Sequence, residues 1–216
     1  MGYSRRPSGI EMAKEDITVV YNFISEEECN TLLEYEKYLT DNDLWDKSDI
    51  ISDPNQHWSK RFLGAANMVI KEKGFGNPKD IEIMNLCIKI RTRIREQIMS
   101  SWNLKEEIYA DSLNLIRWPL GDEQPFHSDY ENFGREPHVW NWRDIGVVLY
   151  LNDDFVGGQI YFPQHDHTIQ IKKRMLAFFP GDKHHVHGVK RIEDGCRYTV
   201  NMFYTYFEQH KDRLPQ

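Results

Sequence analysis

Hydrophobic positions follow two different periods along the chain. Between residues 80 and 102, apolar side chains recur every three or four positions, which is typical of an amphipathic helix. A shorter helix is predicted to begin after Ser25 and to reach about Tyr38, because Ser25 and Glu28 form the sequence signature of a capping box. From Ser112 onward apolar and polar residues alternate, which indicates strands with one face toward a core.

Turn signals divide the second half of the chain into short strands. Gly157-Gly158 and Pro180-Gly181-Asp182 are two of these breaks. The predicted strands are Leu113–Trp118, Gly146–Leu151, Gln159–Phe162, Thr168–Ile171, Met175–Phe179 and Tyr198–Tyr206, with further segments around His127 and His187 and an earlier strand at Ile17–Tyr21. So many short strands predict a mainly β fold with some α: a double-stranded β-helix, or jelly roll, with N-terminal helices packed on one sheet.

We expect one structural domain made of three stretches. Residues 1–14 form a loose tail, residues 15–110 a helical support region and residues 111–208 the double-stranded β-helix core. Residues 41–60 are rich in Asp, Asn and Ser and are predicted to form a long excursion, whose tryptophans either pin it to the core or belong to a lid. The basic residues of the long helix are predicted to form a solvated face: Lys89, Arg91, Arg93 and Arg95.

Composition narrows the function classes. A formal net charge of −7 argues against a broad phosphate-binding surface, so we expect no nucleic-acid partner. The 3 cysteines are widely scattered and suggest neither a disulfide framework nor a zinc site, which favours a reducing compartment. No apolar run approaches membrane-spanning length. We therefore expect a soluble cytoplasmic protein with no membrane partner, and the sequence leaves the oligomeric state open.

The sequence His127-Ser128-Asp129 carries the candidate chemistry. Residues i and i+2 of an extended strand project from the same face, so an imidazole and a carboxylate can reach one cation. A histidine on a neighbouring strand would complete a 2-His-1-carboxylate facial triad, which is diagnostic of non-haem Fe(II) oxygenases. His185 and His187 share strand parity, and spacing alone does not choose between them.

These residues belong to a longer series of motifs. The C-terminal part of the chain resembles the catalytic core of the Fe(II)/2-oxoglutarate-dependent dioxygenases, in their prolyl 4-hydroxylase-like branch. The resemblance covers roughly residues 113–206, and Ile17–Leu33 is similar to that branch's first strand and helix. The matching motifs are His127-Ser128-Asp129, Val148-Leu149-Tyr150-Leu151-Asn152, Gly157-Gly158 with Tyr161-Phe162-Pro163, Leu176-Ala177-Phe178-Phe179-Pro180, His187-Gly188-Val189 and Gly195-Cys196-Arg197-Tyr198.

The resemblance implies a role for each motif residue. His127, Asp129 and His187 would bind Fe(II) and act as the catalytic centre, with 2-oxoglutarate as cosubstrate, O2 as oxidant and ascorbate in support. Arg197 would hold the distal carboxylate of 2-oxoglutarate, because a planar guanidinium binds a carboxylate bidentately and stays charged when buried. Tyr150 stands where this branch places a hydroxyl on the same carboxylate.

The resemblance also bears on the open choices and shows departures. His187 matches the motif better than His185, because Arg197 follows it by ten residues. Trp118 stands where relatives often carry a tyrosine that contacts 2-oxoglutarate, so that contact is expected to be altered. Arg143 matches an arginine that contacts the substrate backbone in oxygen-sensing relatives, and a plain salt bridge is an equal alternative.

The function expected from this resemblance is hydroxylation of a prolyl residue in a protein or peptide, with release of succinate and CO2. Aromatic residues could clamp such a chain: Trp45, Trp58, Tyr130, Phe133, Trp140 and Trp142. The alternatives are hydroxylation of a free amino acid or other small molecule, and a non-catalytic metal-binding jelly roll. A nucleic-acid demethylase would usually carry a second arginine at the position of Phe203 and a basic face, both absent from this sequence.

Overall fold

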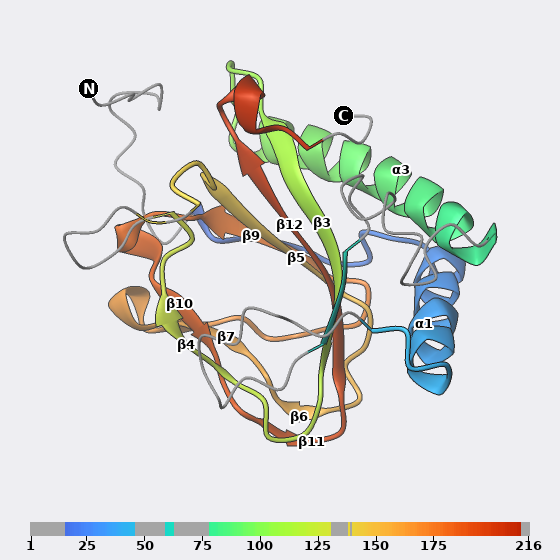
Figure 1. The fold of residues 1–216 in the computed structure, drawn as a ribbon. Helices are drawn as coiled ribbons and strands as arrows, with labels where there is room; N and C mark the ends of the chain where they lie inside the picture. Colours follow the sequence, from blue (N-terminus) through green and yellow to red (C-terminus); the bar gives the residue numbers. More distant parts are fainter. Residues whose placement is uncertain (1–15, 46–58, 63–77, 131–137, 139, 213–216) are drawn as a thin grey trace.

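The computed structural model describes residues 16–45, 59–62, 78–130, 138 and 140–212, and its elements are drawn in Figure 1. The helices are α1 (Glu26–Asp41) and α3 (Pro78–Ser101), and the short 3-10 turns are η3 (Pro163–His165), η4 (Lys183–His185) and η5 (Glu208–His210). The strands are β1 (Thr18–Val20), β2 (Ser59–Phe62), β3 (Tyr109–Trp118), β4 (Gln124–His127), β5 (Ile145–Tyr150), β6 (Val156–Gly157), β7 (Ile160–Phe162), β8 (His167–Thr168), β9 (Leu176–Pro180), β10 (His187–Val189), β11 (Ile192–Asp194) and β12 (Arg197–Thr205).

The strands form two main antiparallel sheets. The larger has the order β1-β9-β5-β12-β3-β2, the smaller has the order β4-β10-β7-β8, and β11 pairs with β6. Figure 1 shows both helices on one side of the larger sheet and the strands β4, β7 and β10 on its other side. This is the predicted jelly-roll arrangement with helical support. No helix among the described residues is long and apolar enough to cross a membrane.

Side-chain alternation gives the larger sheet two different faces. One face packs on the helices in a core that includes Leu115, Val200 and Met202 together with Leu32 and Ile94. The other face packs toward the smaller sheet in a second core, which includes Ile116, Trp118, Val148, Tyr150, Phe162 and Phe179. We call this second side the inner face of the sheet. The period-two pattern of the sequence therefore separates a structural side from the side that encloses the candidate chemistry.

The two helices begin and lie where the sequence predicts. The Ser25 hydroxyl accepts from the Glu28 backbone N–H at 3.0 Å, and the Glu28 carboxylate accepts from the Ser25 N–H at 2.8 Å, so the predicted capping box is confirmed. The solvated basic face is wrong for Arg91, which is only 1% exposed and pairs with Asp212 at 2.6 Å. The chain end near Asp212 meets α3 only in the folded protein, so helix periodicity could not show this partner.

The strand predictions are close but incomplete. The predicted strand Thr168–Ile171 is reduced to β8, which ends at Thr168. Within or beside the predicted 41–60 excursion, Ser59–Phe62 forms a strand that pairs with β3. The described residues do not include 46–58, 131–137 and 139, and therefore not Trp58 or Phe133. Most of the segment predicted as a lid thus lies outside the described residues.

Candidate active site

Three side chains that are distant in sequence converge between the two sheets. His127 ends β4 and His187 begins β10, and the antiparallel pairing sets these two residues directly opposite each other. Asp129 Oδ1 lies 3.8 Å from Nε2 of each histidine. One ligand atom from each of the three residues falls within a span of 4.8 Å. Two imidazoles and one carboxylate at this spacing can coordinate one metal ion and leave positions open.

The histidine rings are oriented by backbone carbonyls. His127 Nδ1 lies 2.9 Å from the Pro125 carbonyl oxygen, and His187 Nδ1 lies 2.9 Å from the His185 carbonyl oxygen. A carbonyl only accepts, so each Nδ1 donates its proton and leaves the Nε2 lone pair for a metal. The Gln124 amide lies 3.3 Å from His127 Nε2 and is a competing contact that a metal would displace.

Burial sets the electrostatics of this cluster. It lowers the pKa of His187 well below its ordinary value, and the nearby His127 lowers it further. Burial also lowers the pKa of His127. The pKa of Asp129 is raised to about 7 by burial, although the positive charge of Arg143 acts in the opposite direction. Neutral imidazoles are the form that binds metal, and a divalent cation would favour the ionised carboxylate.

Two glycines make room for Asp129, and sequence reasoning did not identify either as part of the site. A Cβ added at Gly146 would lie 2.5 Å from Asp129 Oδ2 and 2.7 Å from the Phe179 ring. A Cβ added at Gly181 would lie 2.3 Å from the Arg143 carbonyl oxygen and 2.9 Å from Asp129 Cβ. The Gly181 carbonyl also accepts from the Asp129 backbone N–H at 2.9 Å. For Gly146 the signal available in the sequence was a glycine within a strand, which often marks close approach.

Replacing Gly146 by alanine is expected to weaken metal binding at the triad by about 10- to 100-fold, the usual effect of disturbing the groups that orient a ligand. The added methyl group would push Asp129 Oδ2 or the buried Phe179 ring out of place. A competition titration of Mn(II) against a chelating dye would measure the change. Asn85→Ala, at an exposed position of α3, provides a comparison away from Asp129, and an equal loss of affinity there would contradict the steric account.

Arg197 and Tyr150 lie together on the inner face at some distance from the triad. Both side chains are fully buried, and the Arg197 guanidinium carbon lies 5.1 Å from the Tyr150 ring centroid and 5.0 Å from that of Trp118. Arg197 Nε and Nη1, the Tyr150 hydroxyl and the Thr199 hydroxyl have no hydrogen-bond partner among the described residues. A buried cation with unused donors is costly unless an anion binds there, so this group fits a carboxylate.

Burial is also the main cause of the pKa shifts of Arg197 and Tyr150. Burial lowers the pKa of Arg197 and raises the pKa of Tyr150, while each residue's proximity to the other offsets part of its shift. Gly146, beneath Asp129, and Tyr150 stand four residues apart on β5, which corresponds to about 13 Å along a strand. The inner face therefore carries a candidate metal site near one end of β5 and a candidate carboxylate anchor at the other end.

The structure separates His187 from its neighbour in sequence. His187 joins the triad, whereas His185 is buried and its Nδ1 lies 2.8 Å from Asp182 Oδ1 within a 3-10 turn. His165 contacts the His185 ring, with the ring centroids 5.0 Å apart, and is not a member of the triad. The third candidate ligand is therefore His187, as the motif resemblance implies.

Arg143 lies beside the triad but is already held by other residues. Its Nε donates to Asp111 Oδ2 at 3.1 Å, and the same oxygen accepts from Trp142 Nε1 at 2.7 Å. Its guanidinium carbon lies 4.2 Å from the Trp140 ring centroid and 4.1 Å from that of Phe203. The salt-bridge alternative is thus present, and it uses only the Nε edge of the guanidinium.

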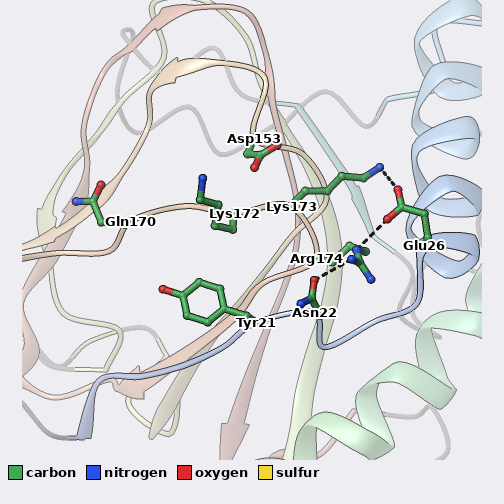
Figure 2. A pocket seen from close by; sticks show the side chains of 8 residues that line it. All are labelled: Tyr21, Asn22, Glu26, Asp153, Gln170, Lys172, Lys173 and Arg174. Atoms are coloured by element: carbon green, nitrogen blue, oxygen red, sulfur yellow. Dashed lines mark hydrogen bonds and ion pairs between the residues drawn. The ribbon is translucent and has the colours of Figure 1, made fainter.

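A separate polar pocket lies where the chain enters α1, and Figure 2 shows the side chains that line it. Lys173 and Arg174 both pair with Glu26, at 2.5 and 3.0 Å, and Arg174 also donates to Asn22 at 2.8 Å. None of the triad residues lines this pocket. Its charges are largely paired with one another, so we place the candidate chemistry between the sheets.

Known proteins share this sequence pattern and this fold. Residues 113–205 match the model of the 2OG-Fe(II) oxygenase superfamily. The chain is 27% identical over 169 residues to prolyl 3-hydroxylase 2 of Homo sapiens, covering 68% of this chain and 24% of that protein. It is 34% identical over 150 residues to prolyl 3-hydroxylase 3 of Mus musculus, covering 59% of this chain and 20% of that protein. The chain thus spans about a quarter or less of the length of these relatives.

Solved structures support the jelly-roll fold. A prolyl hydroxylase from Trichoplax adhaerens, in complex with a hypoxia inducible factor oxygen degradation domain peptide fragment, gives a TM-score of 0.65 at 16% identity, covering 92% of this chain and 86% of that chain. The viral collagen prolyl hydroxylase of Paramecium Bursaria Chlorella virus-1, in its 2OG complex, gives a TM-score of 0.61 at 16% identity, covering 89% of this chain and 97% of that chain.

Proposed function

We propose that this protein is a 2-oxoglutarate-dependent dioxygenase that hydroxylates a prolyl residue in a polypeptide, and the match of residues 113–205 to the model of the 2OG-Fe(II) oxygenase superfamily supports this. The observation that carries the proposal is the presence of two complementary sites between the two sheets. His127 and His187 come from the smaller sheet and form a facial ligand set with Asp129, which lies against Gly146 of β5. The unused donors of Arg197 lie on β12 of the larger sheet, next to β5. A metal-binding module without catalysis would have no need of the second site.

The metal ligands and the carboxylate anchor would have separate roles in this reaction. Bound Fe(II) supplies the activation of O2, coupled to oxidation of 2-oxoglutarate to succinate and CO2 and to hydroxylation of a C–H bond. The three ligands hold the ion and leave positions open for the cosubstrate. Arg197 and Tyr150 would bind the distal carboxylate, and the Trp118 ring beside the guanidinium would replace a polar contact with a cation–π contact. The packed strands exclude water from the reacting atoms.

A polypeptide substrate is supported by the surroundings of Arg143. Asp111 and the Trp140 and Phe203 rings fix the guanidinium, and its Nη groups make no hydrogen bond to any residue in the described part of the chain. A fixed guanidinium whose Nη donors are not used by the described residues suits a main-chain carbonyl, and the flanking rings suit proline. The names of the similar proteins include prolyl hydroxylases, which agrees with this choice. The hydroxylated ring position would be determined from the product.

A screen of proline-containing peptides is expected to yield at least one product heavier by 16 Da, the mass of one oxygen atom. The reaction would contain Fe(II), 2-oxoglutarate, O2 and ascorbate, and fragmentation by mass spectrometry would locate the oxygen on proline. Matched peptides with alanine in place of proline, and free proline, serve as controls. Oxidation of free amino acids with every peptide unchanged would overturn the polypeptide substrate while retaining the dioxygenase.

A further inference from the structure

A row of polar side chains on the inner face continues from Arg197 and Thr199 to residues that have no role in the site described so far. Arg197, Thr199 and Asn201 alternate along β12, and the register places Asn201 directly opposite Asn114 on β3. Ile116 and Val148 belong to the inner core, and Asn114 and Asn201 share their side because residues two apart, or directly paired, face the same way. Two carboxamides therefore face the space between the sheets.

The side-chain oxygens of both asparagines are buried, although Asn201 as a whole is half-buried. Asn114 is 6% exposed, and the side-chain oxygens of Asn114 and Asn201 make no hydrogen bond within the described ranges. The Ser112 hydroxyl, one row further along β3, is also buried and unpartnered. An unsatisfied buried polar atom carries a substantial free-energy cost, so adjacent ones on one wall point to a polar ligand that satisfies them.

Their position relates this pair to the reacting centre. Asn201 pairs with Val148 on β5. Val148 is two residues from Gly146, where an added Cβ would lie 2.5 Å from Asp129 Oδ2. The next pair along β12 is Phe203 with Gly146, and the Phe203 ring contacts Arg143. The carboxamide pair therefore lies one row from the triad carboxylate, beside the residues that surround Arg143. In the other direction along β12, the pair Arg197–Trp118 lies two rows away from the carboxamide pair.

We propose that Asn114 and Asn201 form a subsite for the substrate main chain, in which their side-chain oxygens accept the N–H of the residue that follows the target proline. This inference rests on the proposed prolyl hydroxylase function. A prolyl residue has no N–H of its own, so the nearest main-chain donor belongs to the next residue. Arg143 would supply donors to a substrate carbonyl and the carboxamide pair would supply acceptors, so the two groups are chemically complementary.

Removing the donor from the peptide and the acceptors from the protein tests this subsite. The probe is a fluorescein-labelled peptide with the sequence alanine–alanine–proline–glycine–alanine, compared with the same peptide carrying N-methylglycine after proline. Fluorescence anisotropy would measure both affinities with Mn(II) in place of Fe(II) and 2-oxoglutarate present, so no turnover occurs. We expect N-methylation to weaken binding to the wild-type protein by about tenfold, as loss of one hydrogen bond to a buried acceptor predicts.

The protein variants show whether that loss arises at the carboxamides. In the double variant Asn114→Leu, Asn201→Val, the two peptides are expected to bind within about threefold of each other, since the acceptors are gone. The single variant Asn201→Val provides the same comparison if the double variant does not fold. Asn85→Ala, an exposed asparagine on the outer helix α3, should retain the full tenfold difference.

Each outcome is decisive. An equal effect of N-methylation in the wild type and in the Asn201→Val variant would overturn the subsite, as would wild-type binding that does not distinguish the peptides or that is absent. A separate measurement of succinate formed from 2-oxoglutarate by the Fe(II)-loaded wild type keeps the two proposals apart. If succinate forms while the peptide comparison fails, the dioxygenase stands and only the subsite is wrong.

Discussion

Replacing Asp129 by alanine is expected to abolish turnover of 2-oxoglutarate, lowering it to the background of the metal-free protein. The carboxylate supplies the single anionic ligand, and its Oδ1 lies 3.8 Å from Nε2 of both histidines. Without it, two neutral imidazoles remain, and they hold a divalent cation far less tightly than the complete triad. Succinate production and Mn(II) affinity would be measured on the same preparation.

The fold is expected to survive this substitution. Asp129 Oδ2 is buried without a hydrogen-bond partner in the described part of the protein, so its removal leaves no new unsatisfied group. Circular dichroism and the thermal midpoint should match the wild type closely. Asp153→Ala, at an exposed carboxylate in the pocket of Figure 2, serves as the matched control and should retain full turnover. Full iron-dependent turnover in the Asp129 variant would show that the ligand assignment is wrong.

Replacing Arg197 by alanine is expected to weaken 2-oxoglutarate binding by at least about 30-fold while metal affinity changes little. Losing a buried, charge-assisted bidentate pair costs on the order of 2–5 kcal/mol, which corresponds to that factor or more. The guanidinium is fully buried and its Nε and Nη1 have no partner among the described residues, so a bound carboxylate would be its main counter-charge. Calorimetry with the Mn(II)-loaded protein would measure both affinities.

Two further variants locate the effect of Arg197. Arg197→Lys keeps a positive charge but loses the planar fork, so it should recover only part of the affinity. Arg191→Ala, at an exposed arginine near the same edge of the fold, should bind 2-oxoglutarate as the wild type does. If Arg197→Ala binds 2-oxoglutarate with unchanged affinity, the distal carboxylate has another anchor.

Much of the fold followed from local patterns. The capping box at Ser25, the apolar run of β5 and the alternation along β12 depend on neighbours in sequence, so they could be predicted without tertiary information. The buried pair between Arg91 and Asp212 could not, because its partners are 121 residues apart and meet only when the chain end passes α3. The strand β2 was hidden for a similar reason, since its partner β3 lies about fifty residues away.

The candidate site could also be predicted only in part from the sequence. The family resemblance identified His127, Asp129 and His187, and the antiparallel pairing of β4 with β10 brings the two histidines together. Spacing does not report close approach or missing partners, so it gave no reason to select Gly146 or Asn201. Those residues become informative only when the neighbouring Asp129 oxygen and the unpartnered carboxamide oxygens are located in space.

An anaerobic calorimetric titration with Fe(II) and then 2-oxoglutarate tests the central claim most directly, because it needs no knowledge of the substrate. The proposed site predicts one Fe(II) bound per chain, followed by one 2-oxoglutarate that binds tightly only after the metal is in place. Folded protein that takes up Fe(II) but shows no heat of 2-oxoglutarate binding, or that binds it equally well without metal, would contradict the assignment of both sites to one reaction.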